Sequence, residues 1–543
     1  MNNSIFKFER PQNEPIYGYL PQSEERKKLK DELKRQSSTT IEIPLIIGGK
    51  EVKTGNLGKV VMPHNHSHVL ATYHKATKET VEMAVNAAVE ARKAWSSLPW
   101  TERAAVSLKI AELISKKYRC LLSAATMLGQ SKNPYQAEID CPCEAIDFLR
   151  FNAHFASMIY EDQPKSENSH FDRLEYRPLE GFVYAITPFN FTAIACNLNM
   201  APVIMGNVTV WKPATTAILS NYYLMQVYRE AGLPDGVINF VPGQGSVISD
   251  VVFNHKAFAG VHFTGSTSTF DNFWKIIGNN IERYGTYPKI VGETGGKDFI
   301  FVHNSANVEE VAAAMVRGAF EYQGQKCSAA SRSYVPKSMW NSLLTILKDM
   351  TSKIKIGDVC DFRNLMNAVI DEKSFDTIMS YIGKAKKSES AEIVIGGEGD
   401  KSKGYFVQPT VILAHDPHFA SMEEEIFGPV LTVYVYDDDK YVETLHLCDT
   451  TSPYALTGAL FAIDRYAIRQ GEEILKYACG NFYINDKPTG AVVGQQPFGG
   501  ARRSGTNDKA GFHTNLMRWV SPQAIKETYN PATQVDYSYM SEE

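Results

Sequence analysis

The sequence predicts an α/β protein built largely on parallel sheets. Short runs of β-branched and aromatic residues alternate with amphipathic helical stretches, which is the pattern of strand–helix–strand units. The composition is that of an ordinary globular protein, with 44% hydrophobic and 22% charged residues in a chain of 543. At roughly 100–200 residues per domain, this length allows about three domains.

The first half of the chain has the pattern of a doubly wound nucleotide-binding unit. Helices are expected over 77–98, 101–130 and 137–160, with Thr77 or Thr80 as a candidate N-cap of the first. Strands are expected at 181–190, 208–213, 237–243 and 260–266, with a further helix at 216–231. Strands and helices in this order are typical of a doubly wound sheet.

The glycine fingerprint of dinucleotide-binding folds is absent from this region. The nearest match starts at Gly243 and Gly245 but lacks the third glycine. A phosphate-binding loop with Gly-Lys-Ser or Gly-Lys-Thr is also missing from the sequence. The motif pattern alone therefore supports a nucleotide site only weakly.

A second set of alternating strands and helices follows and predicts a second α/β domain. A polar segment interrupts the first domain, and it is expected to form a projecting hairpin with the C-terminal region because each strand needs a partner. The predicted layout is an arm at 1–40, a first domain at 41–161 and 181–293, a second domain at 294–487, a loop region at 488–512, and an oligomerisation element at 162–180 and 513–535.

Charge, hydropathy and cysteine content exclude several classes of protein. A net charge of −5 gives no basic surface for nucleic acid. No run reaches the roughly 18 apolar residues of a membrane span, and no targeting signal is readable in residues 1–40. Eight cysteines without a Cys-x-x-Cys motif are too sparse for a disulfide scaffold. Free thiols in a reducing compartment are expected.

Three residues lie in settings that suit catalysis. Cys327 lies among small residues beside Lys326, whose charge favours a thiolate, and a position before a helix would favour it further. Glu293 precedes a Gly-Gly pair, which suggests close backbone approach, and could act as a general base. Asn190 follows a predicted strand, where its amide could donate to an oxyanion. Each also has a structural alternative: a buried thiol, a surface acid and a turn-forming amide.

Two other patterns invite a metal interpretation. His64, His66 and His68 alternate, so on a strand they would share one face. Cys141 and Cys143 form a close pair. Neither set has further ligands nearby in the sequence, so no metal site is predicted.

Seven short motifs occur in the order seen in aldehyde dehydrogenases, and the chain resembles that family over roughly residues 40–530. The motifs are "TPFNF", "VTVWKPA", "FTGS", "GETGGK", "GQKCSAASR", "EEIFGPV" and "GQQPFGGARRSGTNDKAG". The longer "EYQGQKCSAASR" and the late "SPQAIKETY" are similar to family members that oxidise glutamate γ-semialdehyde. The resemblance implies that the first domain binds NAD, that the second is catalytic, and that 488–512 anchors the substrate.

The resemblance assigns roles to the three candidate catalytic residues. Cys327 would be the nucleophile that attacks the aldehyde and then carries a thioester. The Asn190 amide and the Cys327 backbone N–H would hold the oxyanion. Glu293 would activate the water that hydrolyses the thioester.

The same resemblance implies an NAD site without the glycine fingerprint. Lys212 would bind the adenosine ribose, and Gly265 and Ser266 would contact the pyrophosphate at a helix start. The remaining contacts would come from Glu425 and Phe427 at the nicotinamide ribose and from Thr187, Pro188 and Phe189 along the cofactor. Many relatives have Glu three residues after this lysine, which favours NAD over NADP. This chain has Thr215 there, and NAD is still expected.

The implied substrate is an amino-acid semialdehyde. Its carboxylate would be held by Ser328 and by the loop at Thr489, Gly490 and Ala491, with Glu144 near its amino group. Phe191 and Phe498 would sandwich the aliphatic chain, although core packing is the ordinary role of such aromatics.

The expected function is therefore NAD-dependent oxidation of L-glutamate γ-semialdehyde, from Δ1-pyrroline-5-carboxylate, to L-glutamate in proline catabolism. Two alternatives are an NAD(P)-dependent dehydrogenase of another semialdehyde or simple aldehyde, and a catalytically silent structural relative. The expected partners are a small-molecule substrate and a second copy of the chain, with no nucleic acid or membrane. The expected compartment is the mitochondrial matrix in a eukaryote and the cytoplasm in a bacterium.

Overall fold

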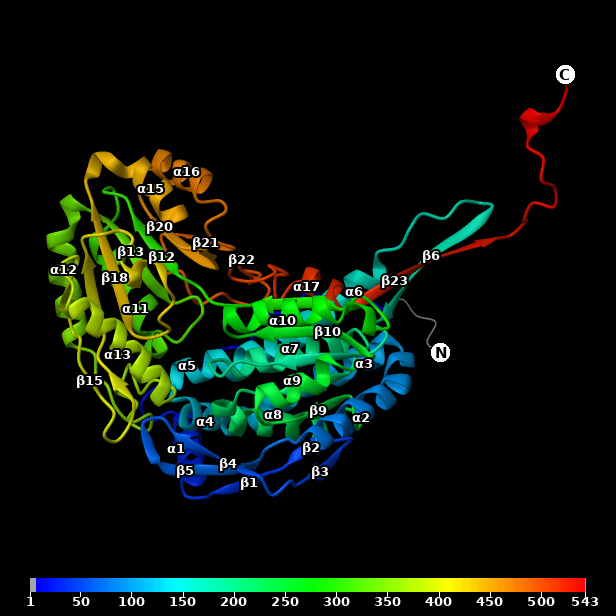
Figure 1. Cartoon of the computed structure of the whole chain (residues 1–543), viewed down its shortest axis with the longest axis horizontal. Coiled ribbons are helices and arrows are strands. Elements are labelled where there is room, and N and C mark those ends of the chain that lie inside the picture. Colours follow the sequence, from blue (N-terminus) through cyan, green and yellow to red (C-terminus); the bar gives the residue numbers. More distant parts are fainter. Residues whose placement is uncertain (1–5, 543) are drawn as a thin grey trace.

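The computed structural model describes residues 6–542, and Figure 1 shows two α/β lobes with a narrow ribbon projecting from one of them. The first lobe holds a seven-stranded sheet of order β11-β10-β7-β8-β9-β2-β3. Its strands are β2 (Leu45–Ile47), β3 (Lys50–Val52), β7 (Phe182–Ile186), β8 (Thr209–Lys212), β9 (Ile238–Phe240), β10 (Phe258–Thr264) and β11 (Lys289–Glu293).

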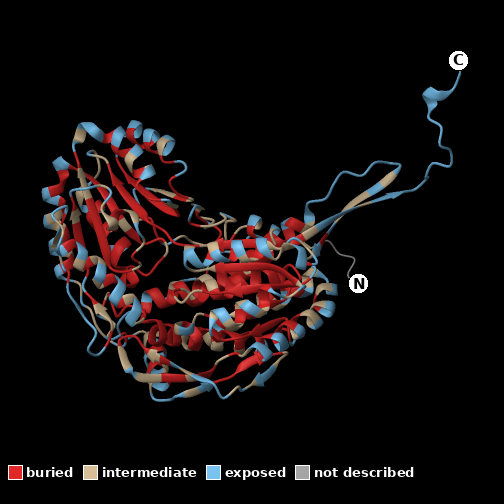
Figure 2. Ribbon diagram, in the orientation of Figure 1, coloured by how far each residue is buried: buried red, intermediate tan, exposed pale blue. Residues whose placement is uncertain are grey.

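The first sheet is doubly wound around β7. Strands β7 to β11 run parallel, whereas β2 and β3 form an antiparallel edge. Because β8 and β10 lie on opposite sides of β7, the chain reverses its direction of winding there, and such switch points are where open α/β sheets bind ligands. Every residue of β7 is buried, as expected of a parallel strand covered on both faces. Figure 2 shows buried residues throughout the interior of both lobes.

The helices of the first lobe depart from the prediction at two places. The stretch 101–130 is α3 (Trp100–Leu113) and α4 (Arg119–Gln130), separated by a π-helical turn at Ile114–Tyr118. A second π-helical turn contains Pro142, which has no N–H to donate and so widens the helix locally. The other helices are α1 (Glu24–Ser37), α2 (Lys78–Ser97), α5 (Pro134–Glu138), α6 (Glu144–Glu161), α7 (Thr192–Ile204), α8 (Ile218–Glu230), α9 (Gly245–Phe253) and α10 (Thr267–Asn279).

The second lobe holds another seven-stranded sheet, of order β14-β17-β18-β13-β12-β20-β21. All neighbours are parallel except β14 and β17. The strands are β12 (Asp298–Val302), β13 (Ala330–Pro336), β14 (Ala391–Ile395), β17 (Thr410–Ala414), β18 (Val430–Tyr436), β20 (Thr457–Phe461) and β21 (Asn481–Ile484). The helices are α11 (Val308–Phe320), α12 (Lys337–Ser352), α13 (Glu372–Lys386), α14 (Ala420–Glu423), α15 (Tyr441–Thr450) and α16 (Arg465–Ile474).

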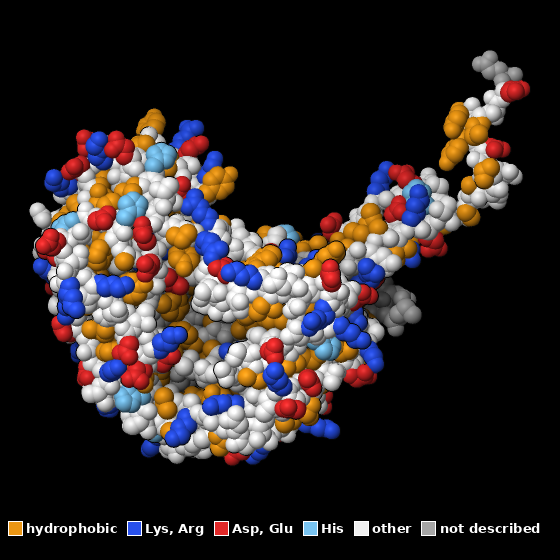
Figure 3. All heavy atoms as spheres, in the orientation of Figure 1, with side chains coloured by type: hydrophobic (Ala, Val, Ile, Leu, Met, Phe, Trp, Pro, Cys, Tyr) orange, Lys and Arg blue, Asp and Glu red, His pale blue; other side chains and the backbone are white. Residues whose placement is uncertain are grey.

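The predicted hairpin is present as the projecting ribbon. β6 (His170–Pro178) pairs antiparallel with β23 (Val520–Thr528), which follows α17 (His513–Met517). Hydrophobic side chains gather at the base of this ribbon (Figure 3).

Shorter strands complete the fold. A separate sheet of β1 (Ile41–Ile43), β4 (Leu57–Met62) and β5 (Asn65–His74) was not foreseen, since these residues were assigned to the first domain as a whole. Two further pairs are β15 (Gly399–Asp400) with β16 (Phe406–Val407), and β19 (Tyr454–Ala455) with β22 (Ala501–Arg502). Over residues 6–542, none of the helices is long and apolar enough to cross a membrane.

Candidate active site

A cavity of about 250 Å³ lies where helix α6, the loop before β13 and the loop after β21 meet. Its apolar wall carries a few polar groups, as is usual for a small-molecule site. The predicted residues that line it are Cys327, Glu293, Glu144, Phe191, Ser328, Thr489, Gly490, Ala491 and Phe498.

Cys327 lies in a tightly packed loop between a short 3₁₀ turn and strand β13. Tyr322 and Gln323 in that turn have φ of +50° and +55°, which is uncommon for residues other than glycine and frequent at functional sites. A Cβ at Gly296 would lie 2.3 Å from the Cys327 carbonyl oxygen. The Gly-Gly pair after Glu293 therefore permits the close backbone approach that the sequence suggested.

The local setting of Cys327 corrects two expectations about its thiol. The residue precedes a strand, so no helix N-terminus favours the thiolate. The Lys326 ammonium instead faces Asp140 at 4.0 Å and Glu321 at 3.9 Å. Burial raises the pKa of the Cys327 thiol well above its usual range, and the nearby carboxylates, Asp298 foremost, raise it further. The thiol of the unliganded protein is therefore neutral and must lose its proton to react.

Asn190 is buried beside the Cys327 loop. Its Nδ2 donates to the carbonyl of Gln325 at 3.1 Å, two residues before the thiol. Asn190 is not among the described residues that line the cavity. The NH₂ group of the Asn190 side chain has two N–H bonds, so one of them remains free to donate to a second acceptor.

Glu293 ends strand β11 on the cavity wall. The Gly500 N–H donates to its Oε2 at 3.0 Å, which orients the carboxylate. Burial raises the pKa of Glu293 well above its ordinary value and Asp508 adds to this, whereas the Gly500 N–H and Lys509 lower it. A carboxylate with a raised pKa accepts a proton more readily, which suits a general base.

Another part of the cavity wall combines a hydroxyl pair with free backbone amides. The Oγ of Ser328 and the Oγ1 of Thr489 lie 2.8 Å apart. Lys487 Nζ donates to the Thr489 carbonyl at 2.9 Å. Among the described residues, the backbone N–H groups of Gly490 and Ala491 have no hydrogen-bond acceptor. Hydroxyls and free N–H groups of this kind can hold a carboxylate.

Glu144 is one of the acidic groups of the cavity wall. Burial, and after it the neighbouring Asp140, raise the pKa of Glu144 to about 8, while Lys132 opposes this shift. Lys132 itself is paired with Asp140 at 2.6 Å and lies over the Phe191 ring at 4.3 Å. Lys132 is therefore already engaged, and the Glu144 carboxyl group stays available to a ligand.

A separate groove of about 680 Å³ lies at the carboxyl ends of β7 and β8, between α9 and α10. Lys212 lines it, and burial alone lowers the pKa of Lys212, without an acidic neighbour to raise it. Ser266 caps α10 by accepting from the Thr269 N–H. Two helix N-termini and an unpaired ammonium suit a diphosphate and a ribose, so the residues present fit NAD.

Glu425 and Phe427 are not among the described residues that line this groove, and Glu425 lies instead beside the Gly-Gly pair that borders Cys327. The Gly296 N–H donates to Glu425 Oε1 at 2.9 Å, and Phe427, with φ of +58°, packs edge-on against Phe189 at 5.8 Å between ring centroids. Gly295 leaves no room for a side chain, since a Cβ there would lie 2.5 Å from Glu425 Oε2. The other predicted cofactor residues lie near the ends of the strands. The Thr187 hydroxyl accepts a hydrogen bond from Trp211 Nε1 at 3.0 Å, and Pro188 follows Thr187. Gly265 leaves no room for a side chain, because a Cβ there would lie 2.7 Å from the Phe263 ring.

The model of the aldehyde dehydrogenase family matches residues 52–525. The chain belongs to this family. A relative named "Delta-1-pyrroline-5-carboxylate dehydrogenase, mitochondrial" from Dictyostelium discoideum is 53% identical over 98% of this chain and 96% of the relative. The Homo sapiens protein of the same name is 48% identical over 97% and 94%.

Solved structures of the family match this aldehyde dehydrogenase over its full length. The Delta-pyrroline-5-carboxylate dehydrogenase from Mycobacterium tuberculosis bound with NAD has a TM-score of 0.96 at 49% identity, covering 100% of both chains. The expected aldehyde dehydrogenase fold, with its two α/β sheets, is thereby confirmed.

Several wall residues of this aldehyde dehydrogenase were not found from the sequence. Asn13, Glu14 and Asp147 line the cavity, as does Lys487. Lys487 directly precedes the anchor loop and could have been noticed, whereas Asn13 and Glu14 are far away in sequence and carry no motif. Among the described residues, no three His, Cys, Asp or Glu side chains are grouped to hold a metal ion.

Proposed function

We propose that this aldehyde dehydrogenase oxidises L-glutamate γ-semialdehyde, the ring-opened form of Δ1-pyrroline-5-carboxylate, to L-glutamate with NAD in proline catabolism. The observation that carries the proposal is one cavity with Cys327 and Glu293 beside carboxylate-binding groups and the Glu144 carboxylate. The names of the relatives support the same substrate.

In the proposed reaction the Cys327 thiol first loses its proton to solvent, and the resulting thiolate attacks the aldehyde carbon and forms a hemithioacetal. The oxyanion accepts hydrogen bonds from the Cys327 backbone N–H and from the second N–H of the Asn190 amide, whose first is directed at Gln325. NAD, when bound, supplies the acceptor for the hydride that leaves this carbon, so that a thioester remains on Cys327.

Glu293 completes the reaction as the general base. Its carboxylate removes a proton from water, which then attacks the thioester and releases glutamate and the Cys327 thiolate. The raised pKa of Glu293 helps it accept this proton, and the Gly500 N–H keeps the accepting group oriented. The base and the nucleophile thus share one cavity wall.

Substrate selection comes from the polar groups of the cavity wall. The Ser328 hydroxyl and the N–H groups of Gly490 and Ala491 hold the α-carboxylate, and Glu144 faces the α-ammonium. Thr489 orients the Ser328 hydroxyl, and Phe191 and Phe498 enclose the aliphatic chain. An aldehyde without the carboxylate and the ammonium loses these interactions.

The cofactor contacts are proposed as follows. Lys212 binds the adenosine ribose, Gly265 and Ser266 at the start of α10 contact the pyrophosphate, and Glu425 with Phe427 contacts the nicotinamide ribose. Thr187, Pro188 and Phe189 border the cofactor near the strand ends.

A comparison of two substrates tests the proposed function. We expect kcat/KM with NAD to be at least about 100-fold higher for Δ1-pyrroline-5-carboxylate than for propanal, because propanal leaves the polar end groups unpaired. A preference for propanal would instead support the alternative of a simple-aldehyde dehydrogenase. Iodoacetamide should abolish NAD reduction and label Cys327; unchanged activity would support a non-catalytic protein.

We also infer a homodimer that forms through the ribbon of β6 and β23. The outer edges of both strands have no partner strand among the described residues, and such edges are usually covered in an assembly. For the compartment, we propose the mitochondrial matrix if the chain is eukaryotic and the cytoplasm if it is bacterial; relatives named as mitochondrial support the first.

A further inference from the structure

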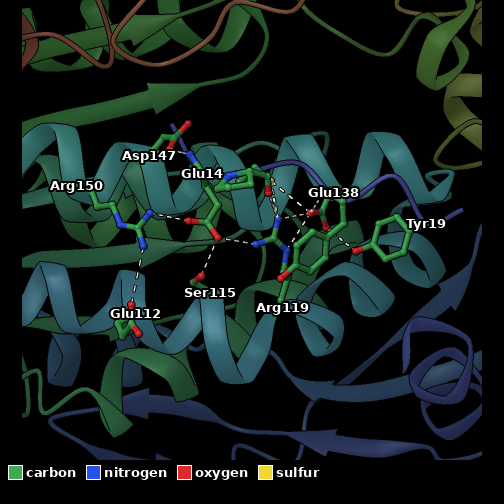
Figure 4. Close-up of polar contacts among 11 residues, drawn as sticks. Glu14, Tyr19, Glu112, Ser115, Arg119, Glu138, Asp147 and Arg150 are labelled. Atoms are coloured by element: carbon green, nitrogen blue, oxygen red, sulfur yellow. Dashed lines mark hydrogen bonds and ion pairs between the residues drawn. The ribbon is translucent and has the colours of Figure 1, made fainter. Parts of the chain in front are cut away.

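An extended N-terminal segment lies against the catalytic cavity. Residues 10–19, here called the N-terminal strap, contain no helix or strand. Figure 4 shows strap residues among polar side chains of α4, α5 and α6. The strap is therefore a folded part of the site, and its contacts determine what it can do.

Asn13 connects the strap to the loop that follows the anchor residues. Its Nδ2 donates to the Val493 carbonyl at 2.8 Å, and its Oδ1 accepts from Gln495 Nε2 at 2.9 Å. The Arg10 guanidinium also donates to the carbonyl of Gly494. Three successive residues of the loop are thus held by two strap side chains.

The strap also holds helix α6 at Asp147. Asn13 Nδ2 donates to Asp147 Oδ2 at 2.8 Å, and the Glu14 backbone N–H donates to Asp147 Oδ1 at 2.7 Å. Asp147 follows Glu144 by three residues, so the two lie on one face of the helix, one turn apart. Both line the cavity. Asn13 therefore bridges the carboxylate-binding loop and the turn that carries Glu144.

A buried ionic network fixes the strap itself. Glu14 is only 9% exposed and accepts hydrogen bonds from Ser115 at 2.7 Å, Arg119 at 2.6 Å and Arg150 at 2.6 Å (Figure 4). Arg119 also donates to Glu138 at 2.9 Å. Buried charges are stable only when paired in this way, so the strap has one well-defined position.

Strap residues form part of the cavity wall. Asn13, Glu14 and Ile16 line the same cavity as Cys327 and Ala491. The strap therefore contributes surface to the space in which the substrate lies, in addition to holding the residues around it.

We propose that the N-terminal strap is a positioning and specificity-determining element. Through Asn13 it sets the spacing between the anchor loop (residues 488–512) and the first turn of α6, which carries Glu144, so that the cavity fits a short amino-acid semialdehyde. This inference rests on the proposed function, because that function supplies the carboxylate and the ammonium that the two held elements bind. In the part of the chain that the structure describes, no strap residue is hydrogen-bonded to Cys327 or Glu293, so we expect the strap to act on substrate binding.

A purely structural strap would behave differently. Partial unfolding lowers the concentration of active enzyme, which reduces kcat equally for every aldehyde and leaves KM unchanged. A strap that positions the binding groups raises KM only for substrates that carry the carboxylate and the ammonium. Propanal carries neither, so the ratio of the two specificity constants distinguishes the roles.

The test compares Asn13→Ala with wild type on Δ1-pyrroline-5-carboxylate and on propanal at saturating NAD. We expect KM for pyrroline-5-carboxylate to rise about tenfold, since charge-assisted contacts at the substrate are loosened, with kcat changed by less than about twofold. We expect kcat/KM for propanal to stay within about twofold. Asn304→Ala, an exposed asparagine of the second lobe, serves as the matched control and should change neither.

Gln495→Ala provides a second variant from the loop side, because Gln495 is exposed and donates to Asn13. It should raise KM for Δ1-pyrroline-5-carboxylate by about threefold. If Asn13→Ala fails to fold, this variant alone tests the strap proposal. Unchanged KM values, or equal losses on both substrates, would overturn the strap proposal alone. A wild-type enzyme that prefers propanal would overturn the proposed function and the strap proposal together.

Discussion

The hydroxyl groups of Ser328 and Thr489 lie 2.8 Å apart although the two residues are 161 positions apart in the sequence. Ser328 follows Cys327, and Thr489 lies in the loop at residues 488–512. Both side chains are buried, so their hydrogen bond is not exchanged for one with bulk water. The contact joins the loop that carries Cys327 to the loop for which we propose a role in binding the substrate carboxylate.

Ser328→Ala should weaken substrate binding more than it slows catalysis. Removal of the hydroxyl deletes one hydrogen bond to the carboxylate, so we expect KM for Δ1-pyrroline-5-carboxylate to rise about tenfold with a smaller fall in kcat. Steady-state kinetics against Ser352→Ala, an exposed serine of α12, checks this. An unchanged KM would remove Ser328 from the carboxylate site.

Cys327→Ala should abolish oxidation of every aldehyde while NAD binding stays largely intact. The thioester cannot form without the sulfur, whereas the groove lined by Lys212 lies apart from the thiol. Activity assays and NAD titration by fluorescence measure the two effects separately. Surviving activity would mean that another residue is the nucleophile.

Gly295→Ala should weaken the use of NAD. The new Cβ would lie 2.5 Å from Glu425 Oε2, so the carboxylate must move away from its proposed ribose contact. We expect KM for NAD to rise about tenfold, whereas Gly383→Ala in α13, where no atom lies within 4 Å of the new Cβ, should leave it unchanged. Equal KM values for NAD in the two variants would contradict the proposed role of Glu425 at the nicotinamide ribose.

The sequence was sufficient to predict the two sheets, because strands leave local patterns. Cys327 and Glu293 were candidates from their neighbours and from the resemblance to a family, and both line the cavity, whereas Asn190 does not. The surroundings of Cys327 were not predictable, because the direction of the Lys326 ammonium depends on Asp140 and Glu321 from other parts of the fold.

The strap could not be predicted for a related reason. The bond between Asn13 and Val493 joins residues 480 positions apart, and neither end has a periodicity or motif. The π-helical turn at Ile114–Tyr118 contains neither proline nor glycine, so the helical pattern of the sequence continues through it. The π-helical turn at Pro142, in contrast, has a cause that is visible in the sequence, because proline has no N–H to donate within a helix.

Phe171→Asp should separate the proposed dimer. Phe171 lies near the tip of β6 and is 43% exposed in the single chain, so a charge there would be buried unpaired in a ribbon-mediated interface. We expect the dissociation constant to rise about 100-fold in analytical ultracentrifugation. Tyr466→Asp, at an exposed site of α16, should leave the assembly unchanged. A monomeric wild type would refute the proposed dimer.

Glu144→Gln should stabilise the fold at alkaline pH. Burial raises the pKa of Glu144 from an ordinary value of 4.5 to about 8. A carboxyl group whose folded pKa is raised contributes most below its unfolded pKa, and this contribution is lost as the pH rises through the folded pKa. Between pH 5 and pH 9 the wild type must therefore ionise a buried group that glutamine lacks. The free energy of unfolding of the variant relative to wild type should be about 1–3 kcal/mol more favourable at pH 9 than at pH 5.

The gain in stability should be accompanied by a loss of function. Glutamine cannot supply the negative charge that faces the substrate ammonium, so we expect KM for Δ1-pyrroline-5-carboxylate to rise about tenfold while kcat/KM for propanal is retained. Urea unfolding at both pH values measures the stability, with the exposed Glu392→Gln of β14 as control. If the difference between variant and wild type were the same at pH 5 and pH 9, Glu144 would not be a group held partly neutral for substrate binding.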